Sequence, residues 1–149
     1  MERITVFTPT YNRRKSLPRV FESLKRQTFR DFIWIIVDDG STDDTKSLVV
    51  EFEKEADFKI TYIYQENAGK HSAINRALQE TTSELFLIAD SDDSFKANAL
   101  EVFINTWESI PEGERNQYKG GIAKCYNAED GTPIGSYRQH MFDINDLDA

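Results

Sequence analysis

The sequence predicts an α/β fold, a mostly parallel sheet with helices on both faces, followed by a short antiparallel hairpin. Apolar runs alternate with helix-like apolar patterns from the start of the chain, and this alternation is typical of βα units with right-handed crossovers. The runs at residues 32–37 and 86–89 are continuously hydrophobic, as expected of parallel strands buried on both faces. Acidic residues follow each run directly.

The first strand covers residues 3–8, and we expect Pro9 to end it because proline cannot donate a ladder hydrogen bond. The helix that follows has Ser16 at its N-cap and Pro18 in its first turn. Its apolar face has the i, i+3, i+4, i+7 spacing of an amphipathic helix and comprises Leu17, Val20, Phe21 and Leu24.

The second strand covers residues 32–37, and the next helix extends to about residue 56. Ser41 and Asp44 have the spacing of a capping box at its start. The apolar face of this helix comprises Leu48, Val49 and Phe52. A third strand over residues 59–64 completes the second βαβ unit.

Gly69 opens a third helix, and the fourth strand covers residues 84–89. The stripe of the third helix comprises Ala73, Ile74, Ala77 and Leu78, and that of a fourth helix comprises Leu100, Phe103, Ile104 and Trp107. Pro111 and Gly113 end the fourth helix. Strands over residues 121–126 and 133–137, joined by a turn at 129–131, form the predicted hairpin.

Composition limits the function classes. A chain of 149 residues with 39% hydrophobic residues can form one domain with a packed core. A net charge of -8 argues against a general nucleic-acid binder. The single Cys125 excludes an internal disulfide, no apolar run approaches the length of a membrane span, and Pro9 interrupts the N-terminal run too early for a signal peptide. We expect a cytoplasmic location, and a peripheral position at the inner face of the membrane stays open.

Carboxylates cluster after two of the predicted strands. Asp90 and Asp92 follow the fourth strand, and Asp38 and Asp39 follow the second. Acidic residues also fill ordinary turns, but ligands of parallel sheets bind beyond the carboxyl ends of the strands. Carboxylate oxygens suit Mg²⁺ or Mn²⁺, so the two acid pairs together predict a nucleotide and metal site at this edge.

Four blocks in order carry a family resemblance: residues 8–12 (TPTYN), 37–43 (VDDGSTD), 67–75 (NAGKHSAIN) and 90–93 (DSDD). They resemble the N-terminal, nucleotide-sugar-binding part of the family 2 glycosyltransferases, which have the GT-A fold. The resemblance covers the chain from Ile4 to about Asp93 and continues more loosely to about Tyr137.

The resemblance implies a pocket for the base of the nucleotide. The loop containing Thr8 and Pro9 would line it, and the ring of Tyr11 would stack on the base. Asp39 is similar to the acid that accepts the imino hydrogen of uracil. For Asp38, a role in binding and a structural hydrogen-bonding role both stay open.

The resemblance also implies a site for the diphosphate and its metal. Gly69 would turn the backbone into a helix whose N-terminus attracts anions, and Lys70 would add a positive charge. Asp90 would bond the ribose or order the metal site. Asp92 would ligate Mn²⁺ or Mg²⁺, with Asp93 as an alternative ligand. His71 lies beside this site without an assigned role.

The predicted function is therefore the donor half of an inverting, metal-dependent glycosyltransferase that uses a UDP-sugar and acts on a glycan or lipid-linked glycan acceptor. In such a family the catalytic base lies beyond the hairpin, and none is identified here, so we expect a chain truncated before the acceptor-binding part. The alternatives are a binding module without turnover and a sugar-phosphate nucleotidyltransferase, although the basic run at residues 13–15 lacks the glycines of a phosphate-wrapping loop. GDP in place of UDP, the sugar, the acceptor and a homo-oligomeric state stay open.

Overall fold

The computed structural model describes residues 2–118, 120–121, 123, 125–127 and 129–134. The chain divides into two compact units, Met1–Thr106 and Trp107–Ala149. The first unit contains the parallel sheet and the segments that carry the predicted site. The second contains the end of the last long helix, a 3-10 helix over Glu112–Gln117 and a short hairpin.

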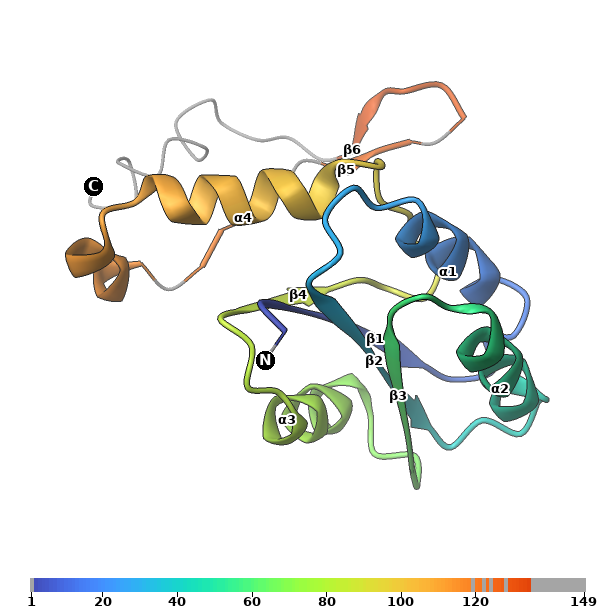
Figure 1. Cartoon of the computed structure of the whole chain (residues 1–149). Helices are drawn as coiled ribbons and strands as arrows, with labels where there is room; N and C mark the ends of the chain where they lie inside the picture. The colour runs from blue at the N-terminus through green and yellow to red at the C-terminus, as the bar shows by residue number, and fades with distance from the viewer. Residues whose placement is uncertain (1, 119, 122, 124, 128, 135–149) are drawn as a thin grey trace. The chain divides into compact units, whose positions relative to one another are not determined.

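The sheet of the first unit has the strand order β3-β2-β1-β4, and all its strand pairs are parallel. The strands are β1 (Ile4–Thr10), β2 (Phe32–Asp39), β3 (Lys59–Gln65) and β4 (Leu85–Ile88). The helices are α1 (Leu17–Lys25), α2 (Thr45–Glu55), α3 (Lys70–Glu80) and α4 (Ala99–Ser109) (Figure 1). The predicted βαβαβαβ order is confirmed.

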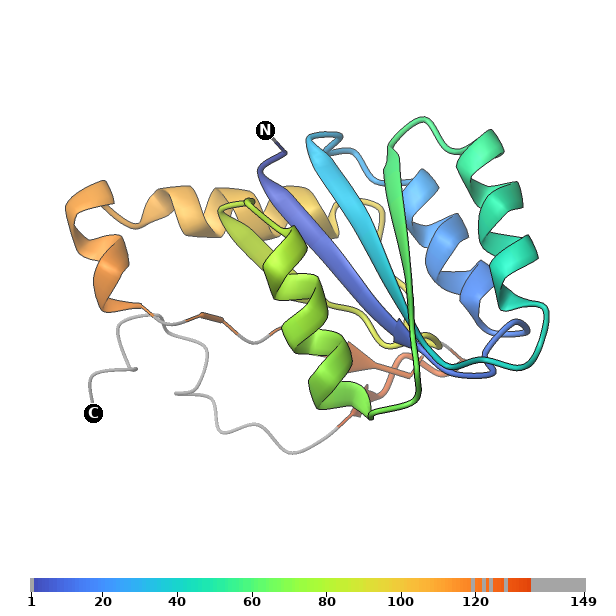
Figure 2. The ribbon, with the colours of Figure 1, turned by 90° about the horizontal axis from the view of Figure 1, so that it is seen from below.

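Helices cover both faces of the sheet, as Figure 2 shows for α3 on one side and α1 and α2 on the other. The larger core cluster joins the sheet to α1, α2 and α4, with Trp34, Phe21, Phe32, Leu24 and Leu100 among its completely or almost completely buried side chains. The smaller cluster lies under α3 and comprises Phe7, Ile33, Ile35, Val37, Ala73 and Ala77. Alternation of the two sets along each strand follows from the two-residue period of a strand.

The expectation that Pro9 ends the first strand was wrong, because β1 continues through Pro9 to Thr10 in register with β2. The carbonyl of Phe7 accepts the N–H of Ala89 at 2.8 Å and therefore faces the β4 side. Pro9, two residues later, faces the same side, where β4 has already ended at Ile88. The missing N–H of Pro9 thus costs no ladder hydrogen bond.

Helix starts differ from the predicted caps. Ser16 precedes α1 but makes no capping bond, and its hydroxyl donates to the Arg13 carbonyl at 3.3 Å. The capping box of Ser41 and Asp44 does not form either, and α2 begins later, at Thr45. The Ser41 hydroxyl instead accepts the N–H of Asn12 from the neighbouring loop. At Ser41 a tertiary hydrogen bond has displaced the local pattern.

The apolar stripe of α3 is only partly buried, since Ala73 and Ala77 are fully buried whereas Leu78 is 48% exposed. In the second unit, β5 (Cys125–Tyr126) and β6 (Pro133–Ile134) form the predicted antiparallel pair in a shorter form. Residues 135–137 of the predicted hairpin lie outside the described residues. Within the described part of the chain, no helix is both long enough and apolar enough to cross a bilayer.

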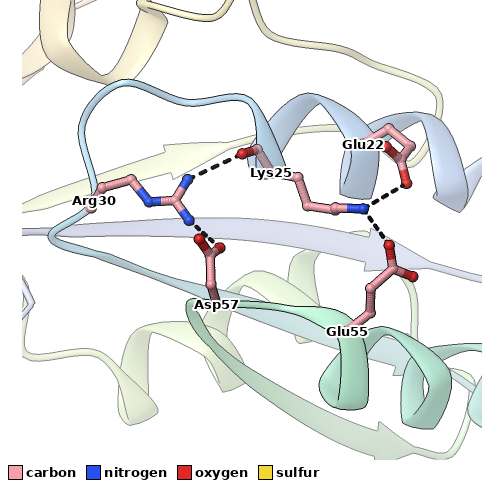
Figure 3. Close-up of polar contacts among 5 residues, drawn as sticks. All are labelled: Glu22, Lys25, Arg30, Glu55 and Asp57. Carbon is pink, nitrogen blue, oxygen red and sulfur yellow. Dashed lines mark hydrogen bonds and ion pairs between the residues drawn. The ribbon is translucent and has the colours of Figure 1, made fainter.

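Ion pairs connect α1 and α2 at their carboxyl-terminal ends (Figure 3). Lys25 pairs with Glu55 and, at 3.5 Å, with Glu22. Hydrogen bonding to Glu55 raises the pKa of Lys25. Arg30 pairs with Asp57 and donates to the Lys25 carbonyl at 3.1 Å. The Lys25–Glu55 pair joins the two helices directly, and each ion pair of this partly exposed kind contributes little to stability.

Replacing Gln27 by leucine is expected to lower the free energy of unfolding by about 2 kcal/mol. The Gln27 side chain is buried, donates to the carbonyls of Ser23 and Lys96 at 2.9 Å each, and accepts the N–H of Leu100 at 3.1 Å. Leucine would remove all three hydrogen bonds and leave the buried Leu100 N–H without the Gln27 acceptor. Urea denaturation of Gln27→Leu measures the loss. The exposed Gln79 of α3 provides the control, since Gln79→Leu should change stability by less than about 0.5 kcal/mol.

Candidate functional site

The four sequence blocks meet at one edge of the sheet, the carboxyl ends of its parallel strands. Thr10 is in register with Asp38, and Asp39 is in register with Gln65. The loops after β1, β2, β3 and β4 therefore lie at the same edge. This is the edge at which α/β sheets bind ligands.

Asn12 joins the loop after β1 to the loop after β2. Its φ of 53° lies in the left-handed region, which asparagine tolerates better than most residues. The Asn12 side-chain oxygen accepts the N–H groups of Thr42 at 2.8 Å and Asp43 at 3.2 Å. The backbone N–H of Asn12 donates to the Ser41 hydroxyl at 2.8 Å. The Arg14 N–H adds a bond to Asp43 at 3.1 Å. The two loops are thus fixed to one another.

Residues of the first block have different surroundings. Thr8 is fully buried, and its hydroxyl accepts the Trp34 Nε1–H at 2.9 Å. Pro9 lies within β1, and Thr10 has a buried hydroxyl without a hydrogen-bond partner among the described residues. Tyr11 is 49% exposed. Of the three residues predicted from this block, Tyr11 is the exposed one, Pro9 is partly exposed and Thr8 is buried.

Asp38 and Asp39 are both buried, and each connects β2 to other segments. Asp38 accepts the Ser41 N–H at 2.8 Å and the Tyr62 hydroxyl at 2.6 Å, and burial together with this bond raises the pKa of Tyr62. Asp39 accepts the N–H groups of Ala68 at 2.9 Å and Gly69 at 2.8 Å. Its third donor is the Gln65 amide at 2.7 Å.

The free energy of unfolding should fall as pH falls below the ordinary range of an aspartate, partly because of Asp39. Burial raises the pKa of Asp39, but the bonds from Ala68, Gln65 and Gly69 outweigh it and hold the pKa below its usual value. A lowered pKa in the folded state means that the stabilisation is complete above the unfolded-state pKa and is lost as pH falls through the folded-state pKa.

Urea denaturation between about pH 6 and pH 3 measures this slope. In Asp39→Asn the slope should be shallower than in the unsubstituted chain, because the titrating group is gone. An unchanged slope would contradict the assigned hydrogen bonds. Asp44→Asn provides a control, since Asp44 is an exposed acid of the same edge.

Lys70 and Asp90 connect the start of α3 to the loop after β4. The Lys70 ammonium donates to the Asp90 carboxylate at 2.5 Å, and both side chains are about half exposed, at 48% and 49%. Gly69 precedes the helix with a φ of 89°, a conformation that suits glycine. The positive charge and the helix N-terminus therefore lie beside the acidic turn.

The acidic turn has a defined shape. The Asp93 carboxylate accepts the Asp90 N–H at 2.9 Å, and the Asp93 N–H donates to the Asp90 carbonyl at 2.9 Å. Burial raises the pKa of Asp93, and the charges of Asp90 and Asp92 add to the increase. Asp92 is exposed, and its carbonyl accepts from Arg19 of α1 at 3.4 Å. Asp92 thus presents a carboxylate that no described contact occupies.

The donor set fits a hard divalent cation that shares its coordination with substrate. Among the described residues, no three His, Cys, Asp or Glu side chains gather as a complete metal site. Mg²⁺ is commonly held by one or two carboxylates together with waters and substrate phosphates. The exposed Asp92, with Asp90 beside the charge of Lys70, matches that mode of binding.

The family model described as "Glycosyl transferase family 2" matches residues 5–146 of the chain. The chain belongs to glycosyl transferase family 2. Membership confirms the predicted family. The GT-A fold is confirmed as well, by superposition on solved structures.

Curated members of glycosyl transferase family 2 are similar to this chain over most of its length. The teichoic acid poly(glycerol phosphate) polymerase of Staphylococcus epidermidis is 34% identical over 73% of the chain and 15% of the polymerase. The GalNAc(5)-diNAcBac-PP-undecaprenol beta-1,3-glucosyltransferase of Campylobacter jejuni is 33% identical over 70% of the chain and 34% of that protein. The putative teichuronic acid biosynthesis glycosyltransferase TuaG of Bacillus subtilis is 32% identical over 90% and 51%. The chain therefore spans about half or less of the length of these relatives.

Two solved structures agree with the fold. S. aureus TarS 1-349 in complex with UDP superimposes with a TM-score of 0.65 at 30% identity, over 72% of this chain and 33% of that chain. The mannosyltransferase PcManGT from Pyrobaculum calidifontis, in complex with GDP-Man and Mn²⁺, gives a TM-score of 0.67 at 29% identity, over 73% and 33%. TarS has also been solved with UDP-GlcNAc.

Two residues of the candidate site are not singled out by the sequence patterns. Asn12 closes the first block. An asparagine directly after a strand is a sequence signal for a turn, and the φ of Asn12 is indeed positive. Gln65 reaches Asp39 only because β2 and β3 are in register, and no local pattern shows this.

Proposed function

We propose that this family 2 chain forms the donor half of a metal-dependent glycosyltransferase that binds a nucleotide-sugar. The observation that carries the proposal is the convergence of Lys70, the N-terminus of α3 and the acidic turn at the carboxyl edge of the sheet. A cationic group, helical N–H groups and a free carboxylate are the partners that a metal–diphosphate needs.

Most of the predicted residues have a role in this proposal. The exposed ring of Tyr11 would stack on the base beside the end of β1, where Thr8 and Pro9 shape the strand. Lys70 and the first turn of α3 would contact the diphosphate. Asp90 would bond the ribose or order the acidic turn.

Asp92 would hold Mn²⁺ or Mg²⁺ together with the diphosphate oxygens. When bound, such an ion supplies Lewis-acid stabilisation for the charge that grows on a departing nucleoside diphosphate. Lys70, now paired with Asp90, would exchange that partner for phosphate, which leaves the Asp90 carboxylate available to the ribose or the metal site.

The donor is proposed to be a UDP-sugar, and the acceptor a glycan or lipid-linked glycan. The UDP in the TarS complex supports uracil as the base of the donor. The relatives named for teichoic acid, teichuronic acid and undecaprenol-linked substrates support the proposed acceptor class. GDP-Man in the PcManGT complex makes GDP the competing nucleotide. The second candidate function is a donor-binding module without turnover, because the chain covers only 15% and 34% of the length of two of these relatives.

Isothermal titration of UDP and of GDP, each with Mn²⁺ and with EDTA, tests the proposal. We expect UDP to bind in the presence of Mn²⁺ and binding to weaken strongly in EDTA. Tighter binding of GDP than of UDP would show that the site prefers guanine to uracil. Failure of both nucleotides to bind would overturn the donor-site proposal for this chain.

A further inference from the structure

We propose that Asn12 is a positioning residue that places the ring of Tyr11 for stacking on the base of the nucleotide. The inference rests on the proposed function, in which Tyr11 contacts the base, and it gives a role to a residue that acts through Tyr11 instead of touching the ligand. The bonds of Asn12 to the loop after β2 carry the inference.

The side chain of Tyr11 has few restraints of its own. It is 49% exposed, and within the described part of the chain it makes no hydrogen bond, ion pair or ring contact. Such a ring keeps much of its rotamer freedom, so the backbone on either side of Tyr11 sets where the ring can lie. On the N-terminal side this backbone is Thr10, the last residue of β1, which is in register with Asp38 of β2.

On the C-terminal side, Asn12 holds the backbone. Its φ of 53° turns the chain directly after Tyr11. The Asn12 side-chain oxygen accepts the N–H groups of Thr42 at 2.8 Å and Asp43 at 3.2 Å. The backbone N–H of Asn12, which donates to the Ser41 hydroxyl at 2.8 Å, belongs to the same planar peptide group as the Tyr11 carbonyl. These bonds therefore fix the peptide group that follows Tyr11.

The loop that receives these bonds is itself attached to the start of α2. The Asp43 carboxylate accepts the N–H of Thr45 at 3.2 Å and the Thr45 hydroxyl, and Thr45 is fully buried. The Arg14 N–H donates to Asp43 at 3.1 Å, and the Arg14 guanidinium donates to the Asp44 carbonyl at 2.6 Å. The segment after β1 is thus held against a buried helix start.

Preorganisation is the physical gain from these bonds. Asn12, Thr42 and Asp43 are all exposed, so their hydrogen bonds compete with water and add little to the stability of the fold. Without them, residues 11–13 would be ordered only when the nucleotide binds, and the entropy lost at that moment would weaken binding. A positioning role therefore appears in affinity more than in stability.

A double-mutant cycle on UDP affinity tests the inference. UDP with Mn²⁺ is titrated into the unsubstituted chain, Asn12→Gly, Tyr11→Ala and the variant with both changes. Glycine tolerates the positive φ, so Asn12→Gly removes the side-chain acceptor alone. We expect Asn12→Gly to weaken UDP binding about five- to tenfold when Tyr11 is present and less than about twofold in the Tyr11→Ala chain, because the ring through which Asn12 acts is gone.

A conservative variant and an NMR measurement complete the test. Asn12→Asp keeps an acceptor oxygen and a residue that tolerates a positive φ, so it should retain UDP affinity within about twofold. In the ligand-free chain, the amide protons of Thr42 and Asp43 should shift upfield in Asn12→Gly, since they lose their acceptor, and much less in Asn12→Asp.

Three results would overturn the inference: no loss of affinity in Asn12→Gly, the same loss with and without the Tyr11 ring, or a loss in Asn12→Asp as large as that in Asn12→Gly. A Tyr11→Ala chain that binds UDP as tightly as the unsubstituted chain would overturn it as well. Failure of the unsubstituted chain to bind UDP would instead overturn the proposed function.

Discussion

Substitution of Gly40 by alanine is expected to lower the free energy of unfolding by about 3 kcal/mol and to disturb the site at the same time. Gly40 follows β2 with a φ of 86°, where an L-residue costs roughly 1–2 kcal/mol. A Cβ at this position would also lie 2.9 Å from the Asn67 backbone nitrogen. Because that neighbour is backbone, relief requires the loop to move, at a further cost of about 1–3 kcal/mol.

Three glycines allow the two contributions to be separated. Gly69 has a φ of 89°, and nothing lies within 4 Å of the position that a Cβ would take, so Gly69→Ala should show the backbone cost alone. Gly113 has neither feature and should tolerate alanine with almost no change. Urea denaturation of the three variants should rank Gly40 first, Gly69 second and Gly113 last. Equal losses for Gly40→Ala and Gly69→Ala would show that the approach to Asn67 does not matter.

Most of the fold can be predicted because burial on both faces leaves a clear local pattern. β2 is buried at every position, and its run from Phe32 to Val37 is continuously apolar. The α1 stripe is buried as its spacing indicates. The errors lie at element ends, where one long-range contact decides the outcome: Pro9 stays in β1 because β4 is short, and Ser41 bonds Asn12 instead of capping α2.

The site was predictable as a location more than as a set of contacts. Parallel strands bring the residues that follow β1, β2, β3 and β4 to one edge, so acids and glycines found there in sequence must be neighbours in space. What each side chain contacts depends on register between strands. Asp39 meets Ala68 and Gly69 across the β2–β3 pair, and Lys70 meets Asp90 across the sheet edge. Neither contact has a signature in local sequence.

Asp92→Asn is expected to reduce Mn²⁺-dependent UDP affinity by about a hundredfold, since loss of an outer partner of a metal site already costs roughly 10–100-fold and Asp92 is proposed as a direct ligand. Asp92 is exposed, and its side chain makes no hydrogen bond or ion pair described in the structure, so its removal should leave stability within about 0.5 kcal/mol. An isosteric amide keeps the shape of the turn and removes the charge. Titration of UDP with Mn²⁺ and with EDTA measures the effect.

The comparison with Asp93→Asn shows whether position in the turn or total negative charge matters. Asp93 has the same charge, but its carboxylate accepts the Asp90 N–H, so it supports the turn from within. Asp93→Asn should therefore cost stability and at most about tenfold in affinity. In EDTA, Asp92→Asn should bind UDP as well as the unsubstituted chain does, because only the metal-dependent part is lost. Equal losses in both variants, or a loss that persists in EDTA, would mean that Asp92 does not hold the ion.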